Sequence, residues 1–409
     1  MGRCIKIYNK IPLELTKMPY CKFKIHVKVI LMTKGYYKLD VYFKDKNWMN
    51  VFVAAWLELI KLTQTAMEGS FMVLFRMLPC IGYLVLACAK SYKIVYNRPV
   101  FEKFVNDLRE MWPQREVTVE EHRILSKALK QLRRVSKGYY WCNVMLYIVF
   151  TFPPYIRIVE RLTGKDLPLI LSFYFWLPFD QFQRGYYETL LLLQTWQCFL
   201  TLWFIIAGDL LFCVIITHIT TQFDLLSVKV TTFFDVPVDK QLPASYPLGK
   251  LPVGQFIDCD DEYNNEKFKH SCLCRLSRDL EEIFSFSLLL NFLNSSIIIC
   301  FCGFCCVFVE KWNEMEYKTF LATSTAQIWL LCWYGQRLID AVRVSAALYN
   351  SGWYLSSQKM RKCILIMIHR SQSELHVTTY GFSVVSLASF STIIKTSWSY
   401  FTLLINMYN

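Results

Sequence analysis

The sequence lacks the short motifs that mark the common enzyme active sites. It contains no GxxxxGK phosphate loop, no HExxH zinc motif, no GxSxG nucleophile elbow and no paired CxxC motifs. Its six histidines are scattered, and none forms an acid–base pair with a recognisable spacing. These absences argue against an enzyme, and we expect no cofactor.

Charge is also scarce. Only 19% of the 409 residues are charged, against about 25% in a typical soluble protein, while 54% are hydrophobic. The mean hydropathy is +0.28. The sequence therefore predicts an all-α integral membrane protein. In such a protein the position of the basic residues matters more than the net charge of +13, so the charge does not indicate nucleic acid.

The sixteen cysteines do not indicate a disulfide framework or a metal site. The densest group, "CFCGFCC" at 300–306, lies in an apolar run, where small apolar side chains packing in a bilayer are favoured over metal ligands. Cys272 and Cys274 have no matching histidine and cysteine set for zinc. The first 46 residues hold eleven Lys and Arg and no signal-peptide core, so the first span is expected to direct insertion.

Seven apolar runs approach the roughly 20 residues that a helix needs to cross a bilayer. They lie at about 47–67, 71–91, 139–158, 189–216, 283–309, 317–340 and 377–408. The first is the weakest, because it contains Glu58 and Lys61. We therefore predict seven transmembrane helices.

The basic residues predict the direction of the spans. The N-terminal segment and alternate intervals hold 36 Lys and Arg, whereas the complementary intervals hold six. Basic residues gather on the cytoplasmic side, which predicts an intracellular N-terminus and an extracellular C-terminus. This direction disfavours a seven-helix G-protein-coupled receptor, a class whose N-terminus lies outside.

This topology divides the chain into five segments. We expect a cytoplasmic N-terminal segment (1–46), four spans with the ligand-pocket region and an outer loop at 159–188 (47–216), and a cytoplasmic helix extension and loop (217–282). Two spans with a cytoplasmic anchor (283–376) and the last helix (377–409) follow. The acidic run "DCDDEYNNE" at 258–266 is predicted to be a solvated loop, since it lacks the spacing of a calcium-binding loop.

Several stretches resemble the insect odorant receptor family. "LLCWYGQRLIDAVRVSAALYNSGWY", "RKCILIMIHRSQ" and "SYFTLLINMYN" are similar to that family's C-terminal third. "YFWLPFDQFQRGYYETLLLLQ" resembles its second outer loop, and "KHSCLCRLSRDLEEIFS" its entry to span five. The resemblance covers residues 135–409 well. The end of the chain also approximates a gustatory-receptor signature, but the outer loop and "CWYGQ" favour the odorant branch.

The resemblance implies a ligand-gated, non-selective cation channel. In this family four subunits surround a pore, and an odour-tuned subunit assembles with a shared co-receptor in a heterotetramer. The loop between spans four and five is shorter here than in the co-receptor, so this chain resembles a tuning subunit. The ligand would be a small volatile odorant, and the location the plasma membrane of a sensory neuron. The alternatives are a gustatory-type channel, a G-protein-coupled receptor and a structural membrane protein.

The last predicted helix carries a polar stripe. At 100° per residue, small polar residues and one leucine fall on one face at steps of three or four. They are Ser389, Thr392, Thr396, Ser399, Leu403 and Asn406. Such a stripe is explained either by close contact between helices or by a water-filled pore along the helix. With the family resemblance we favour the pore, and we expect Leu403 to form its gate with Asn406 beside it. Lys395 lies about 60° from the stripe, reaching either the pore or an internal polar group.

The resemblance places the ligand in the outer half of the membrane between spans two, three, four and six. An odorant pocket should be concave, aromatic and sparsely polar. The candidates at suitable depth are Phe75, Leu78, Phe150, Tyr155, Trp196, Phe199, Thr323 and Gln327. Pro153 and Pro154 are expected to bend or end span three and to shape the mouth of the pocket.

Overall fold

The computed structural model describes fourteen stretches of the chain, in which nearly every residue is helical. They are residues 48–67, 71–96, 98–110, 118–164, 168–173, 175–177, 181–183, 185–232, 260–308, 314–341, 344–351, 353, 358–372 and 375–408. The predicted cytoplasmic segment 1–46 lies outside them. Within them the prediction of an all-α fold is confirmed.

The helices follow the predicted apolar runs and extend several of them. Their bounds are α4 (Trp48–Met67), α5 (Phe71–Tyr96), α6 (Arg98–Glu110), α7 (Val119–Leu162), α8 (Tyr186–Thr232), α9 (Asp260–Phe308), α10 (Glu314–Ala341), α11 (Val344–Asn350), α12 (Gln358–Ser371) and α13 (Leu387–Tyr408). Among the described residues, α7, α8 and α9 are long and apolar enough to cross a membrane by length and composition. Each predicted run overlaps one helix.

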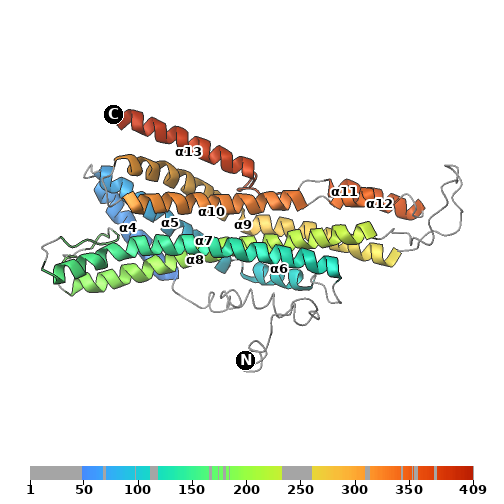
Figure 1. Ribbon diagram of the computed structural model, residues 1–409, viewed down its shortest axis with the longest axis horizontal. Helices are drawn as coiled ribbons and strands as arrows, with labels where there is room; N and C mark the ends of the chain where they lie inside the picture. Colours follow the sequence, from blue (N-terminus) through green and yellow to red (C-terminus); the bar gives the residue numbers. More distant parts are fainter. Residues whose placement is uncertain are drawn as a thin grey trace, which may run out of the picture.

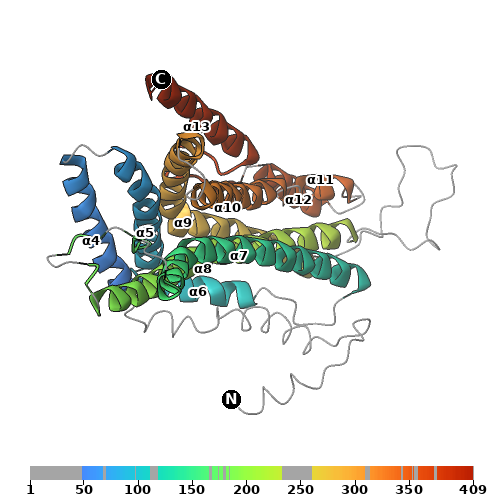
Figure 2. The same cartoon turned by 60° about the vertical axis from the view of Figure 1, so that its left-hand side comes forward.

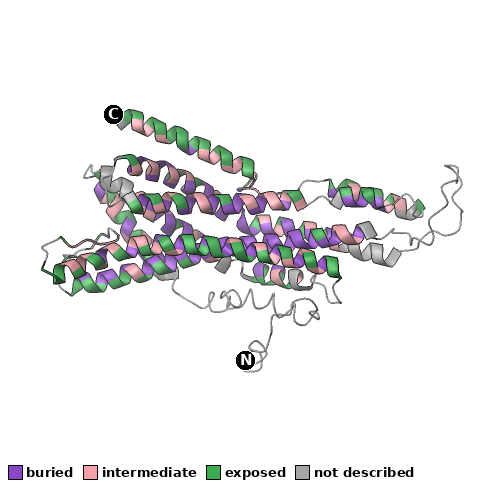
Figure 3. Cartoon of the chain, viewed as in Figure 1, coloured by how far each residue is buried: buried purple, intermediate pink, exposed green. Residues whose placement is uncertain are grey.

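The long helices α7, α8, α9 and α10 run together along the longest axis of the molecule (Figure 1). Helices α4 and α5 pack side by side at one end, which is clearest in Figure 2, and α11 and α12 lie toward the other. Helix α13 packs against α9 and α10. Figure 3 shows α13 as largely exposed, whereas the middle of α8 is buried. The core thus lies around α8, and α13 lies on its margin.

A local sequence feature explains where α7 begins. Thr118 and Glu121 form a capping box: the Thr118 hydroxyl accepts from the Glu121 N–H at 3.3 Å, and the Glu121 carboxylate accepts from the Thr118 N–H at 2.9 Å. Pro153 and Pro154 do not end the helix, which continues to Leu162.

Two predictions of local structure are wrong. The acidic run at 258–266 is not a loop throughout, because α9 begins at Asp260. Acidic residues stabilise the first turn of a helix, and no proline or glycine follows Asp260 before Gly303. The last helix does not begin near residue 377, since α13 starts at Leu387.

A buried polar network centred on one carboxylate joins five helices. Asp209 on α8 pairs with the Lys90 ammonium of α5 at 2.6 Å, and both side chains are at most 3% exposed. Asp209 also accepts hydrogen bonds from the Tyr139 hydroxyl of α7 and the Gln327 amide of α10, both at 2.8 Å. The Gln327 amide donates further to Asn291 on α9 at 3.0 Å. Because a buried charge is costly unless it is paired, this network requires the five helices to keep their relative positions.

We expect Asp209→Asn to lower the free energy of unfolding by roughly 3–5 kcal/mol, because it leaves the Lys90 ammonium buried without a counter-charge. Unfolding of the detergent-purified protein measures this. Asp107→Asn is the matched control, since Asp107 pairs with Arg275 at 3.2 Å and that arginine is 59% exposed. Such surface pairs contribute about 0–1 kcal/mol. Equal losses from the two variants would contradict the structural role of the network.

Candidate ligand cavity and last helix

A cavity of about 300 Å³ lies where α4, α5, α7 and α10 meet the segment 170–173. This volume is at the lower end of the range for small-molecule sites, roughly 300–1,000 Å³. Its lining residues are Glu58, Met77, Pro79, Cys80, Phe150, Pro153, Pro154, Arg157, Ile170, Leu171, Ser172, Phe173, Glu316, Tyr317 and Phe320. The cavity therefore combines apolar and aromatic walls with a few charged side chains.

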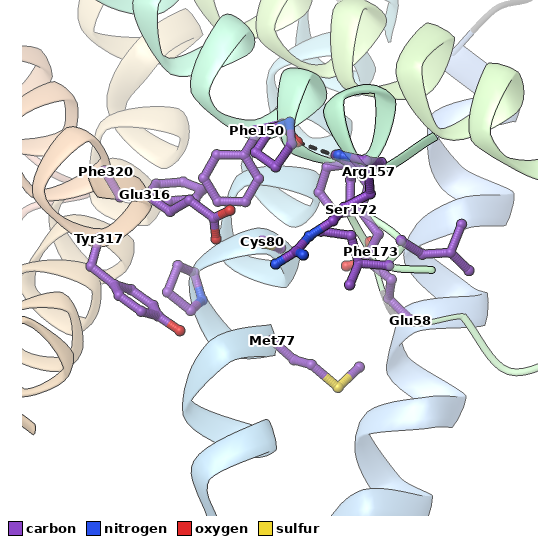
Figure 4. Close-up of a pocket in the computed structure, with 15 residues that line it drawn as sticks. Glu58, Met77, Cys80, Phe150, Arg157, Ser172, Phe173, Glu316, Tyr317 and Phe320 are labelled. Atoms are coloured by element: carbon purple, nitrogen blue, oxygen red, sulfur yellow. Dashed lines mark hydrogen bonds between the residues drawn. The ribbon is translucent and has the colours of Figure 1, made fainter. Parts of the chain in front are cut away.

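The aromatic wall has a defined geometry. The rings of Phe150 and Phe320 meet edge to face with centroids 4.6 Å apart, and Phe150 also stacks on Phe173 at 6.1 Å. Figure 4 shows Glu58 from α4 and Glu316 from α10 on opposite sides of this wall. A small ligand between them would meet aromatic faces and polar groups from several helices.

Part of the predicted outer loop folds back over the cavity. Its Ser172 hydroxyl donates to the Phe150 carbonyl on α7 at 3.0 Å. The Gln194 side chain of α8 bonds the Phe173 backbone twice, at 2.9 and 3.3 Å. The Tyr187 hydroxyl donates to the Ile170 carbonyl at 2.9 Å. These bonds hold residues 170–173 against α7 and α8 as a wall of the cavity.

One of the eight predicted ligand residues, Phe150, lines this cavity. Trp196 and Phe199 lie outside it, 51% and 41% exposed, and stack on each other along α8 with ring centroids 5.6 Å apart. Tyr155 bonds the Thr195 hydroxyl of α8 at 2.9 Å, and Leu78 is half-buried on α5.

The remaining three predicted ligand residues have other positions. Phe75 lies in α5, but its side chain is outside the described part of the structure. Thr323 is buried, and its hydroxyl donates to the Thr319 carbonyl one turn earlier at 2.8 Å. Gln327 belongs to the Asp209 network. Pro153 and Pro154, expected at the mouth of a pocket, do line the cavity.

The last helix is attached to the rest of the molecule by one face. Ser397 is fully buried, and its hydroxyl donates to the Ser296 carbonyl of α9 at 3.3 Å. Close by, the Phe401 ring lies against Gly303 of α9, where an added Cβ would come within 3.3 Å of it. These contacts leave the opposite face uncovered.

The predicted stripe lies on that uncovered face. Its residues Thr392, Thr396, Ser399, Leu403 and Asn406 are all exposed, Leu403 by 54%, and Lys395 is exposed too. The Thr392, Thr396 and Ser399 hydroxyls donate to backbone carbonyls one turn earlier, at 2.8–3.1 Å. Each hydroxyl hydrogen is therefore used in a hydrogen bond within the helix. The oxygen lone pairs can still accept hydrogen bonds from, or coordinate, groups beside the helix.

A small hairpin, residues 377–385, positions the start of α13. The Val385 N–H donates to the Val377 carbonyl at 2.8 Å, and Gly381 at the tip adopts the left-handed conformation, with φ of 80°. The hairpin lies against α10 at Gly335, where an added Cβ would be 2.2 Å from the Val385 carbonyl oxygen. Ser386 then caps α13 by accepting from the Ser389 N–H at 3.3 Å.

Comparison with known proteins identifies the family. A family model described as 7tm Odorant receptor matches residues 70–398. The chain belongs to this family. Odorant receptors 85c and 85b of Drosophila melanogaster are each 26% identical to it, over 377 and 372 residues, which is 88% of this chain and 90% of each relative. The chain is thus a multi-pass membrane protein and an odorant receptor, and not an enzyme.

The fold is similar to a solved receptor. The insect olfactory receptor OR5 from Machilis hrabei superposes with a TM-score of 0.75, and its complex with eugenol with 0.74. Each comparison covers 99% of this chain and 96% of the other, at 16% identity. At that identity the likeness establishes the fold alone.

We expect Gly335→Ala to destabilise the receptor by about 1–3 kcal/mol, because the new methyl group meets a backbone carbonyl that cannot rotate away. Gly138→Ala is the matched control. Gly138 lies in α7 with open space around it, so alanine should stabilise the helix by roughly 0.5–1 kcal/mol. Thermal unfolding of both variants measures the difference, and a neutral Gly335→Ala would contradict the close contact between α10 and the hairpin.

Proposed function

We propose that this odorant receptor is the odour-tuned subunit of a ligand-gated, non-selective cation channel. Seven helices cross the plasma membrane of a sensory neuron, with the N-terminus inside and the C-terminus outside. The subunit assembles with a shared co-receptor in a heterotetramer, and α13 of each subunit faces the central pore. A small volatile ligand binds in the cavity and shifts the population toward an open state.

The observation that supports this proposal is the uncovered face of α13. A helix that packs by one face in a membrane usually turns an apolar opposite face to lipid, whereas this one presents hydroxyls, an amide and a lysine. Hydroxyl oxygens whose lone pairs face away from the helix suit the passage of partly hydrated cations. Leu403, the apolar member of the stripe near its end, would form a constriction that excludes water when closed.

Lys395 on α13 fits a mixed tetramer better than a homotetramer. Four exposed lysines around one pore would repel cations, whereas fewer copies reduce that repulsion. The proposed co-receptor supplies the remaining subunits.

The position of the cavity agrees with the proposed direction of the chain. It lies at the end of the bundle where α4 and α5 are joined and where α10 begins. With the N-terminus inside, this end is the outer half of the membrane, which an odorant reaches from outside. Its volume of about 300 Å³ suits a small volatile molecule.

The gate is tested by Leu403→Ala, expressed with the co-receptor and recorded in whole cells. We expect the basal current to rise at least about tenfold, since losing the burial of a leucine side chain costs roughly 1.5–3 kcal/mol and 1.4 kcal/mol is tenfold in an equilibrium constant. Ile405→Ala is the control, because this residue lies about 160° around the helix from Leu403. Unchanged basal current and permeation in Leu403→Ala would show that the gate is elsewhere.

The cavity is tested by Phe150→Ala, again with the co-receptor. We expect the half-maximal odorant concentration to rise by about tenfold or more, because a buried aromatic contact is lost, while the basal current stays unchanged. Phe199→Ala is the matched control, since Phe199 is exposed on α8 outside the cavity. An equal shift in both variants would mean that the ligand binds elsewhere.

A further inference from the structure

A second, smaller hollow of about 30 Å³ adjoins the ligand cavity. The two share five lining residues: Glu58, Cys80, Phe150, Phe173 and Phe320. The small hollow extends from these toward α8, where Thr201 lines it, and along α5 to Tyr83. A volume of about 30 Å³ exceeds the roughly 10–15 Å³ that one water molecule needs, so the hollow has room for a small polar group.

Three of the residues that line this hollow have polar side-chain atoms without partners. Both carboxylate oxygens of Glu58, the Tyr83 hydroxyl and the Thr201 hydroxyl are buried and have no hydrogen-bond partner within the described residues. The three side chains are 2%, 3% and 6% exposed and come from α4, α5 and α8. Buried polar groups in proteins are nearly always hydrogen-bonded, so this cluster indicates a missing partner.

The chemistry of the cluster defines that partner. A carboxylate only accepts hydrogen bonds, and each hydroxyl donates one but can accept two, so the three groups together have more acceptor sites than donors. Among the described residues that line the small hollow none is basic, and the remaining walls are mostly apolar or aromatic. Arg157 lines only the larger cavity and is 3.8 Å from Glu160. When Glu58 is ionised, it therefore has no counter-charge in the hollow.

We propose that the small hollow binds the ammonium head group of a primary amine ligand. An ammonium has three N–H donors and no acceptor, which matches Glu58, Tyr83 and Thr201, and it supplies the missing positive charge. The hydrocarbon part of the ligand lies in the larger cavity against Phe150 and Phe320. This inference rests on the proposed function, in which the cavity binds the odorant, and adds the chemical class of that ligand.

Hexylamine, 1-hexanol and hexanal test the proposal, because they share a chain length and differ in the head group. Alkylamines are protonated at pH 7, as lysine is. Binding is measured with radiolabelled hexylamine on the purified receptor–co-receptor complex, and the other two compounds compete for the site. We expect hexylamine to bind at least about tenfold tighter than either, since hydrogen bonds to charged groups are stronger than those between neutral groups.

Glu58→Gln should remove that preference while leaving 1-hexanol binding within about threefold, which also shows that the variant is folded. Tyr83→Phe should weaken hexylamine binding severalfold. Tyr155→Phe is its matched control, because that hydroxyl bonds Thr195 and lies outside both hollows. If hexylamine binds no tighter than 1-hexanol, or equally well to Glu58→Gln, the hollow is a buried water site only and the proposal is wrong.

Current recordings separate this inference from the proposed channel. Glu58-dependent amine binding without any evoked current would contradict the channel and leave the amine site standing. Currents evoked by other odorants, without preferential amine binding, would contradict the amine site and leave the channel standing. If none of the three compounds binds, the amine site is wrong, and the Phe150→Ala recordings decide separately whether the cavity binds an odorant.

Discussion

The pairing of Asp209 with Lys90 is the constraint on which the helix bundle depends. Both groups are buried, and a carboxylate removed from water is stable only when its partners stay within hydrogen-bond distance. Because Tyr139 and Gln327 bond the same carboxylate, α5, α7, α8 and α10 are held around one point, and Asn291 adds α9. Apolar contacts between these helices have no preferred direction, whereas the hydrogen bonds of this junction specify one arrangement.

Helix α10 connects the parts of the receptor that the proposed function uses. Phe320 near its start lines the cavity, Gln327 joins the Asp209 network, and Gly335 near its end contacts the hairpin that leads into α13. These positions span fifteen residues, or about 22 Å of helix. A ligand that displaces Phe320 would therefore act on a rigid element that ends against the support of the proposed pore helix. This is a physical route for coupling, with a packed contact at each step.

The sequence predicts the helices well and the cavity poorly. Apolar runs locate the spanning helices because burial in lipid requires long apolar segments, and periodicity places the α13 stripe on one exposed face. The cavity depends on the path of residues 170–173, which side-chain contacts with α7 and α8 determine and helical periodicity does not. Equally, Trp196 and Phe199 are aromatic, as the residues of an odorant pocket should be, but both are exposed on the surface of α8. The sequence does contain a signal for Glu58, because an acidic residue within an apolar span usually marks a functional site.

The central claim is that ligand binding opens a water path along the exposed face of α13. Cysteine accessibility from the outer side tests it most directly, with currents recorded as a water-soluble thiol reagent is applied and the unsubstituted receptor as the control. Asn406→Cys, outside the proposed gate, should react with or without ligand, whereas Thr396→Cys, inside it, should react only when ligand is bound. Reaction of Thr396→Cys at the same rate in both states, or equally fast reaction of Ile405→Cys, would contradict the account.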